Sequence, residues 1–152
     1  MTDNPVTGRN ATINDFDLTY SLKERSTKHL IEKIWGWDNN FQLDYHKSQF
    51  DPNKTKIIVK DNKDIGYISV REEQDRILIE NIIIDPCYQA QGIGTIVLSD
   101  LIKKGRNEQK NIELQVLRIN TRAKSLYDRL KFDTFEQTDL HFKMRYTNTS
   151  GI

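Results

Sequence analysis

Two glycines, Gly92 and Gly94, stand between an apolar run and a helical pattern, where a backbone turn can bind an anion. The apolar run at 82–84 predicts a buried strand that ends at Pro86, because proline cannot donate to a strand ladder. Amides in the first turn of a helix have no partner inside the helix, and the helix dipole makes that end positive. The turn therefore suits a phosphate or pyrophosphate, and an ordinary strand-to-helix connection is the alternative interpretation.

The spacing of these glycines excludes the two commonest phosphate motifs. A P-loop needs Gly-Lys-Ser/Thr, and Thr95 rather than lysine follows Gly94. A dinucleotide fingerprint needs a third glycine three residues after the second, and Val97 occupies that place.

What remains, Gln89-x-x-Gly92-x-Gly94, resembles the signature of the GNAT superfamily of N-acetyltransferases, Gln/Arg-x-x-Gly-x-Gly/Ala. A second element that resembles the family follows, Asn120-x-x-Ala123-x-x-Leu126-Tyr127 and then Leu130-Lys131-Phe132. Family members usually end this element in Gly-Phe, so Lys131 departs from the pattern and makes the local backbone there a point to examine.

The resemblance implies an enzyme that transfers an acetyl group from acetyl-CoA to a primary amine by direct attack in a ternary complex. It implies that backbone amides of the turn hold the pyrophosphate and that the backbone of the preceding strand holds the pantetheine arm. The alternative for that strand is a fully paired core strand. The expected cofactor-binding residues are Ile82, Ile83, Ile84, Gln89, Ala90, Gln91, Gly92, Ile93, Gly94, Thr95, Asn120 and Ala123.

By the same resemblance, Tyr127 is the expected general acid for the leaving thiolate. A phenol has a pKa near ~10, close enough to the ~8.5 of a thiol to protonate it. The alternative is a core aromatic residue. Asn120 is expected to contact the cofactor or to cap the helix that follows, and both roles are compatible.

Glu80, in an otherwise apolar strand, is the expected base for the amine, with desolvation raising its pKa. The alternative is an outward-facing residue or a partner of a nearby cation, with water as the base. Trp35 and Trp37 are expected to bind the acceptor, and packing of their aromatic cluster against the sheet is the alternative.

No metal site is expected, because Cys87 and the three histidines, His29, His46 and His141, lack ligand spacing. Cys87 has no cysteine-enzyme motif around it and is expected to be an ordinary loop residue. A lone cysteine also fits a reducing cytoplasm, which is the expected location, and the start of the chain does not resemble a signal peptide.

The elements that must position these residues alternate between strand and helix patterns. A strand is expected near 13–19, and the Ser-x-x-Glu motif at Ser21 predicts a helix over 22–35, followed by a short helix with Phe41 and Tyr45. Strands follow at 55–60, 65–71 and 77–84. A helix from Gly92 to Gly105, a strand at 112–117, a helix over 121–131 and strands near 133–137 and 141–146 complete the chain.

This order predicts an α/β (α+β) fold with a GNAT-like mixed, mostly antiparallel sheet flanked by helices. One domain over residues 1–152 is expected, with frayed polar ends at about 1–12 and 147–152. A net charge of +1 removes the electrostatic argument for nucleic-acid binding, and no apolar run is long enough to span a membrane. A non-catalytic acyl-CoA sensor is the alternative function, and a monomer or a homodimer is expected.

Overall fold

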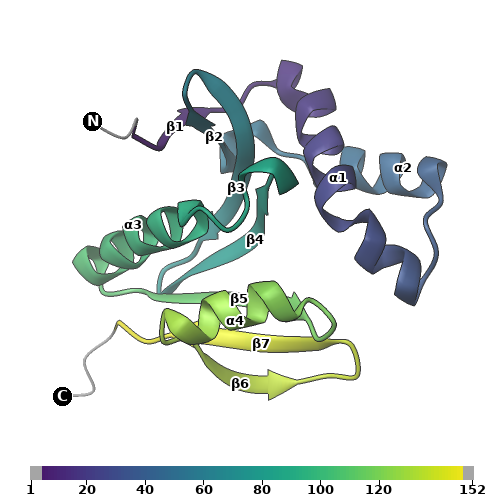
Figure 1. Cartoon of the computed structure of the whole chain (residues 1–152). Coiled ribbons are helices and arrows are strands. Elements are labelled where there is room, and N and C mark those ends of the chain that lie inside the picture. The colour runs from purple at the N-terminus through teal and green to yellow at the C-terminus, as the bar shows by residue number, and fades with distance from the viewer. Residues whose placement is uncertain (1–4, 149–152) are drawn as a thin grey trace. The chain divides into compact units, whose positions relative to one another are not determined.

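The computed structural model describes residues 5–148, which Figure 1 draws in colour. The chain divides into two compact units. Unit 1 comprises the described residues up to Ser69 together with Asn81–Gln91. Unit 2 comprises Val70–Glu80 and the described residues from Gly92 onward. Within residues 5–148, no helix has the length and apolar character that crossing a membrane requires.

A mixed sheet with the strand order β1-β2-β3-β4-β5-β7-β6 contains all the strands of the described residues. The pairs β1·β2, β2·β3, β5·β7 and β6·β7 are antiparallel, and β4·β5 is parallel. The expected mixed, mostly antiparallel sheet is confirmed. The strands are β1 (Thr7–Asn10), β2 (Thr55–Lys60), β3 (Lys63–Glu72), β4 (Arg76–Ile84), β5 (Asn111–Leu117), β6 (Asp133–Gln137) and β7 (His141–Tyr146).

Four α-helices accompany the sheet within the described residues. They are α1 (Phe16–Ile34), α2 (Asn39–Gln49), α3 (Ile93–Glu108) and α4 (Thr121–Arg129), and short 3-10 turns lie at Ile13–Asp15, Pro52–Lys54 and Pro86–Tyr88. Helix α3 connects the parallel strands β4 and β5, which is the crossover that the sequence predicts.

The start of the chain differs from its prediction. The expected strand at 13–19 is wrong, because Thr12 and Asp15 form a capping box that begins a 3-10 turn, and α1 follows directly. The side chain of Asp15 accepts from the Thr12 amide at 2.8 Å and pairs with Arg9 at 2.9 Å. Ser21 therefore lies inside α1 rather than at its start.

Three further details are corrected. Thr7–Asn10, predicted to be frayed, pair with β2, and the Asn148 side chain donates to the carbonyls of Ile102 and Lys110. Of the expected frayed ends, residues 1–4 and 149–152 lie outside the described residues. Helix α3 does not end at Gly105 but continues to Glu108, where Gln109 caps it with a left-handed φ of 57°. Gly105 instead allows close packing. A Cβ there would lie 2.8 Å from Ile112 Cδ1.

Each unit buries its own apolar residues. In unit 1 the core joins α1 to β2, β3 and β4 through Leu22, Ile57, Tyr67 and Ile83. In unit 2 the fully buried side chains include Ile77, Ile93, Leu98, Ile112 and Met144. The strand-to-helix turn up to Gln91 belongs to unit 1, and helices α3 and α4 belong to unit 2.

Candidate active site

The end of β4, in unit 1, is held very close to β3. A Cβ on Gly66 of β3 would lie 2.3 Å from the Ile83 carbonyl oxygen, so only glycine fits there. One step further, the Asp85 amide donates to the Ile65 carbonyl at 2.7 Å. The segment Ile82–Ile84, expected to hold the pantetheine arm, is therefore a strand with a fixed position against β3.

The last carbonyl of β4 accepts two side-chain hydrogen bonds. Ser26 Oγ of α1 donates to the Ile84 carbonyl at 2.9 Å, and so does Gln89 Nε2 at 2.9 Å. Because a carbonyl oxygen has two lone pairs, this acceptor is saturated. The side chain of Gln89, expected to bind the cofactor, holds the turn itself, and its contact with a cofactor stays a prediction.

Asp85 connects the strand end to α1. Its Oδ2 pairs with Arg25 at 2.6 Å, and its Oδ1 accepts from the Cys87 amide at 3.0 Å. Sequence reasoning missed Arg25, Ser26 and Asp85. The Asp85-Pro86 pair was a usable indication, because aspartate before proline commonly caps a short turn.

The glycine turn needs left-handed backbone at two places. Ala90 in unit 1 has φ 63°, and Gly92 at the start of α3 in unit 2 has φ 79°. The first hydrogen bond within α3 joins the Ile96 amide to the Gly92 carbonyl at 3.1 Å. The amides of Ile93, Gly94 and Thr95 precede that bond, so they have no partner within the helix and can donate to an anion.

Gly94 also brings α3 close to α4 within unit 2. A Cβ on Gly94 would lie 3.0 Å from Cδ2 of Leu126 on α4. The two sequence elements that carry the family resemblance therefore contact each other at this glycine.

Asn120 caps α4, as one of its two expected roles requires. Its side-chain oxygen accepts from the amide of Ala123 at 3.2 Å. At the other end of α4, Lys131 has φ 74°, the left-handed conformation that favours glycine. Lys131 therefore adopts the conformation that glycine takes most easily, at a cost of roughly 1 kcal/mol in backbone strain.

Tyr127 lies on the inward face of α4 and is 6% exposed. Its ring packs against Phe132, with centroids 5.8 Å apart, and Phe132 in turn packs against Tyr146 of β7. Burial raises the pKa of Tyr127 to about 12. The phenol is therefore protonated throughout the physiological pH range, as a proton donor must be.

Glu80 occupies a different environment from the expected one. Its side chain is 32% exposed and its Oε2 lies 3.9 Å from Arg71 Nη1, so the premise of a desolvated carboxylate is wrong. The parallel ladder between β4 and β5 ends at the pair Leu78 and Glu113, just before this residue. Glu80 therefore follows the point where β4 loses its β5 partner.

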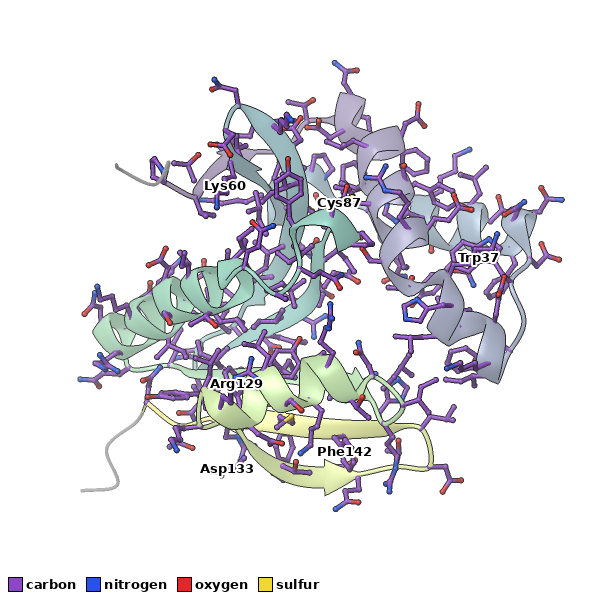
Figure 2. The ribbon with its side chains drawn as sticks, in the orientation of Figure 1. Trp37, Lys60, Cys87, Arg129, Asp133 and Phe142 are labelled. Carbon is purple, nitrogen blue, oxygen red and sulfur yellow. The ribbon has the colours of Figure 1, made fainter. Side chains whose placement is uncertain are left out.

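The aromatic cluster of unit 1 is exposed. Trp35 is 60% exposed and Phe41 63% exposed, which does not fit packing against the sheet. Trp37 donates from Nε1 to Asn39 at 2.7 Å, and Lys28 lies over its ring. Figure 2 shows Trp37 beside the start of α2. Binding of an acceptor by Trp35 and Trp37 stays a prediction.

Cys87 is exposed on the 3-10 turn that follows β4 (Figure 2). Among residues 5–148, no three His, Cys, Asp or Glu side chains gather where they could hold a metal ion.

The chain is similar to a known protein family. A family model described as the acetyltransferase (GNAT) family matches residues 17–132. A search of curated proteins found no match.

Solved structures of acetyltransferases share the fold over nearly the whole chain. PaiA N-acetyltransferase from Thermoplasma acidophilum, solved in complex with coenzyme A, aligns with TM-score 0.77 and 16% identity over 94% of this chain and 99% of that one. The ribosomal-protein-S18-alanine N-acetyltransferase from Escherichia coli aligns with TM-score 0.71 and 19% identity over 97% and 96%. An acetyltransferase from Thermus thermophilus aligns with TM-score 0.75 and 14% identity over 96% and 99%.

Proposed function

As a member of the acetyltransferase (GNAT) family this chain is an acyltransferase, and we propose that it transfers an acetyl group from acetyl-CoA to a primary amine by direct attack in a ternary complex. The observation that carries the proposal is the start of α3, where Gly92 has φ 79° and the amides of Ile93, Gly94 and Thr95 have no partner within the helix. The coenzyme A in the PaiA structure supports the choice of acyl donor.

Acetyl-CoA supplies an activated acetyl group whose carbon–sulfur bond breaks as the new carbon–nitrogen bond forms. The chain must orient that group and manage two protons. Backbone groups of Ile82 and Ile83 are proposed to bind the pantetheine arm. The Ile84 carbonyl already accepts two side-chain hydrogen bonds, so Ile84 is proposed to fix the position of the strand end rather than to bind the arm through this carbonyl.

Tyr127 is proposed to hold the proton that the departing thiolate takes. Burial raises the pKa of Tyr127 to about 12, which widens its distance from an ordinary thiol near ~8.5. The proposal places the thiol in the same low-polarity surroundings, where burial disfavours a thiolate as it disfavours a phenolate and so offsets part of that difference.

Loss of the proton from the amine is proposed to use Glu80, directly or through water. Its side chain is 32% exposed, so the carboxylate stays in contact with solvent beside Arg71. Glu80→Gln is expected to lower turnover across the pH profile. An unchanged profile would assign the base to water alone.

Trp35 and Trp37, which follow the end of α1, are proposed to contact the amine acceptor, because Trp35 is 60% exposed and the Trp37 ring already has the Lys28 ammonium 5.9 Å from its centroid. Ring faces attract ammonium groups, so a cationic amine fits them. Trp35→Ala is expected to raise KM for the acceptor and to leave KM for acetyl-CoA unchanged.

The most direct test measures release of the CoA thiol from acetyl-CoA against a panel of polyamines, amino acids and peptides. Amine-dependent release supports the proposal. Cofactor binding without turnover on any amine would indicate the sensor instead.

The turn itself has a matched test. Gly92 and Gly36 both have left-handed φ, 79° and 76°, and a Cβ on either would meet no atom within 4 Å. Gly92→Asp and Gly36→Asp therefore introduce the same backbone strain, but only the first places a carboxylate where phosphates are proposed to bind. Gly92→Asp should weaken acetyl-CoA binding at least tenfold (~1.4 kcal/mol) and Gly36→Asp should leave it unchanged, as measured by calorimetry.

We also propose that the chain forms a single domain, is located in the cytoplasm and acts as a monomer or a homodimer. The lone cysteine of the chain supports a reducing compartment. Light scattering on the purified protein decides between monomer and dimer.

A further inference from the structure

Two consecutive residues of α1 form polar contacts with two consecutive residues at the end of β4. Arg25 pairs with the Asp85 carboxylate at 2.6 Å, and Ser26 donates to the Ile84 carbonyl at 2.9 Å. All four residues belong to unit 1, where α1 passes the short turn after β4 (Figure 1). We name these four residues the α1–β4 clasp.

The clasp acts on the residue where the strand becomes the turn. Asp85 uses its amide for Ile65 of β3, its carbonyl for the Tyr88 amide and its Oδ1 for the Cys87 amide. Its remaining oxygen, Oδ2, takes the Arg25 guanidinium. Strand, turn and helix therefore meet at Asp85, and a shift of its side chain must alter the turn.

Burial makes the clasp more than a surface ion pair. The side chain of Asp85 is 16% exposed, whereas that of Arg25 is 51% exposed. A largely buried carboxylate that loses its cation is driven toward solvent, because an unpaired buried charge is strongly unfavourable. In Asp85 that movement would break its bond to the Cys87 amide and loosen the start of the turn.

The Ser26 contact fixes the neighbouring carbonyl. The Ile84 carbonyl accepts from Ser26 and from Gln89, the first residue of the Gln-x-x-Gly-x-Gly pattern. One acceptor thus ties α1, β4 and the turn together. Removing Ser26 leaves the Gln89 bond in place, so its loss is the milder of the two changes.

We propose that Arg25 and Ser26 are positioning residues for the acyl donor, holding the end of β4 and the first half of the turn in the geometry that binds it. Neither is assigned a contact with the donor or the acceptor. This inference rests on the proposed function, since it concerns the affinity of the same donor site.

The test measures the Kd of acetyl-CoA by calorimetry in five proteins: the unaltered chain, Arg25→Met, Arg25→Lys, Ser26→Ala and Lys143→Met. Arg25→Met keeps the length of the side chain and removes its charge, and about fivefold weaker binding is expected. Arg25→Lys should restore most of the affinity, because an ammonium still pairs with Asp85. Ser26→Ala should weaken binding about twofold to threefold. Lys143→Met removes an exposed pair with Glu136 on the β6–β7 hairpin and should change nothing.

A double-mutant cycle with Asp85→Asn separates positioning from general loss of stability. The asparagine oxygen can still accept from the Cys87 amide, but the ion pair is gone. Arg25→Met in that background should then have no further effect on Kd. Independent effects of the two changes would overturn the clasp, as would an unchanged Kd in Arg25→Met.

Steady-state kinetics provide the readout that a merely structural role would not move. In Arg25→Met, KM for acetyl-CoA should rise while kcat and the acceptor KM stay near their original values, measured well below the unfolding temperature. An equal fall of kcat in all variants would contradict positioning. If the unaltered chain binds no acetyl-CoA, the proposed function fails; if it binds and Arg25→Met binds equally well, only the clasp fails.

Discussion

Helices α2 and α4 distribute their side chains in opposite ways. On α4 the apolar positions face inward, and Tyr127 is 6% exposed. On α2 the buried residues are Gln42 and His46, at 8% and 4% exposure, while Phe41 and Tyr45 are 63% and 47% exposed. Helix α4 thus serves the core and the proposed chemistry with one face, whereas α2 buries polar groups and presents aromatic ones.

The buried polar face of α2 is stabilised by specific contacts rather than by the burial of apolar side chains. His46 Nε2 hydrogen-bonds with Thr19 of α1 at 2.8 Å, and the imidazole lies 5.0 Å from the Phe16 ring centroid and 5.7 Å from that of Phe50. On the outer face, Phe41 and Tyr45 stack nearly parallel, with Lys23 over the Tyr45 ring. On α4 the buried side chains are therefore the apolar ones, whereas on α2 a polar side chain is buried because it is hydrogen-bonded.

The largest expected effect concerns the inward face of α4. Tyr127→Phe removes the proposed acid and should lower kcat by about 100-fold or more, with little change in the KM of either substrate. Because burial raises the pKa of Tyr127 to about 12, the rate of the unaltered enzyme should not fall between pH 7 and pH 10.

The matched control is Tyr67→Phe. Tyr67 is 1% exposed, burial raises its pKa, and among the described residues its hydroxyl is the buried side-chain polar atom without a hydrogen-bond partner. Its loss should leave kcat unchanged and stability unchanged or improved. Near-normal turnover in Tyr127→Phe would remove the acid role.

The inward face of α2 gives the next effect, on stability. Burial, and then the nearby Lys23, lower the pKa of His46 to about 4, below the 6.5 of an unperturbed histidine. The unfolded chain therefore binds a proton that the folded chain rejects as the pH falls from 6.5 to 4. Above pH 6.5 the folded chain has its full stability with respect to this group. As the pH falls from 6.5 to 4, the free energy of unfolding should decrease by up to ~3 kcal/mol.

Urea denaturation of the unaltered chain and of His46→Gln at pH 7 and pH 4.5 checks this. Glutamine does not titrate in this range, so the variant should lose less stability on acidification. An equal loss in both proteins would contradict the role of His46.

A smaller effect is expected at the end of α4. Lys131 has φ 74°, so Lys131→Gly relieves left-handed strain and should raise the free energy of unfolding by about 1 kcal/mol. Lys131→Ala keeps the strain and serves as the control. A fall in stability on introducing glycine would show that the lysine side chain contributes more than its backbone costs.

The smallest effect is expected on the outer face of α2. Phe41→Ser should change the free energy of unfolding by less than ~0.5 kcal/mol, because the ring is mostly exposed. Leu126→Ala on α4, where Leu126 faces Gly94, should cost more. Similar losses of unfolding free energy in the two variants would contradict the difference in burial between α2 and α4.

The sequence predicted best where local rules decide the structure. The passage from β4 through Gly92 to α3, the Asn120 cap and the inward face of α4 follow from glycine, capping and periodicity. The start of α1 was missed because Thr12 and Asp15 cap it earlier than the motif at Ser21 suggests. The environment of Glu80 depends on Arg71 of β3, and the clasp depends on Arg25, which lies 60 residues from Asp85 in the sequence. The Asp85-Pro86 pair indicates a turn but does not identify the helix residues that contact it.

Direct transfer of the acetyl group from acetyl-CoA to an amine can be followed by mass spectrometry of both the protein and the amine. The enzyme is incubated with acetyl-CoA first alone and then with the amine that supports CoA release. Direct attack predicts an unmodified chain in the first mixture and an acetylated amine in the second, formed at least 100-fold more slowly by Tyr127→Phe. Acetylation of the chain at the exposed Cys87 before the amine is added, followed by its transfer to the amine, would contradict direct attack.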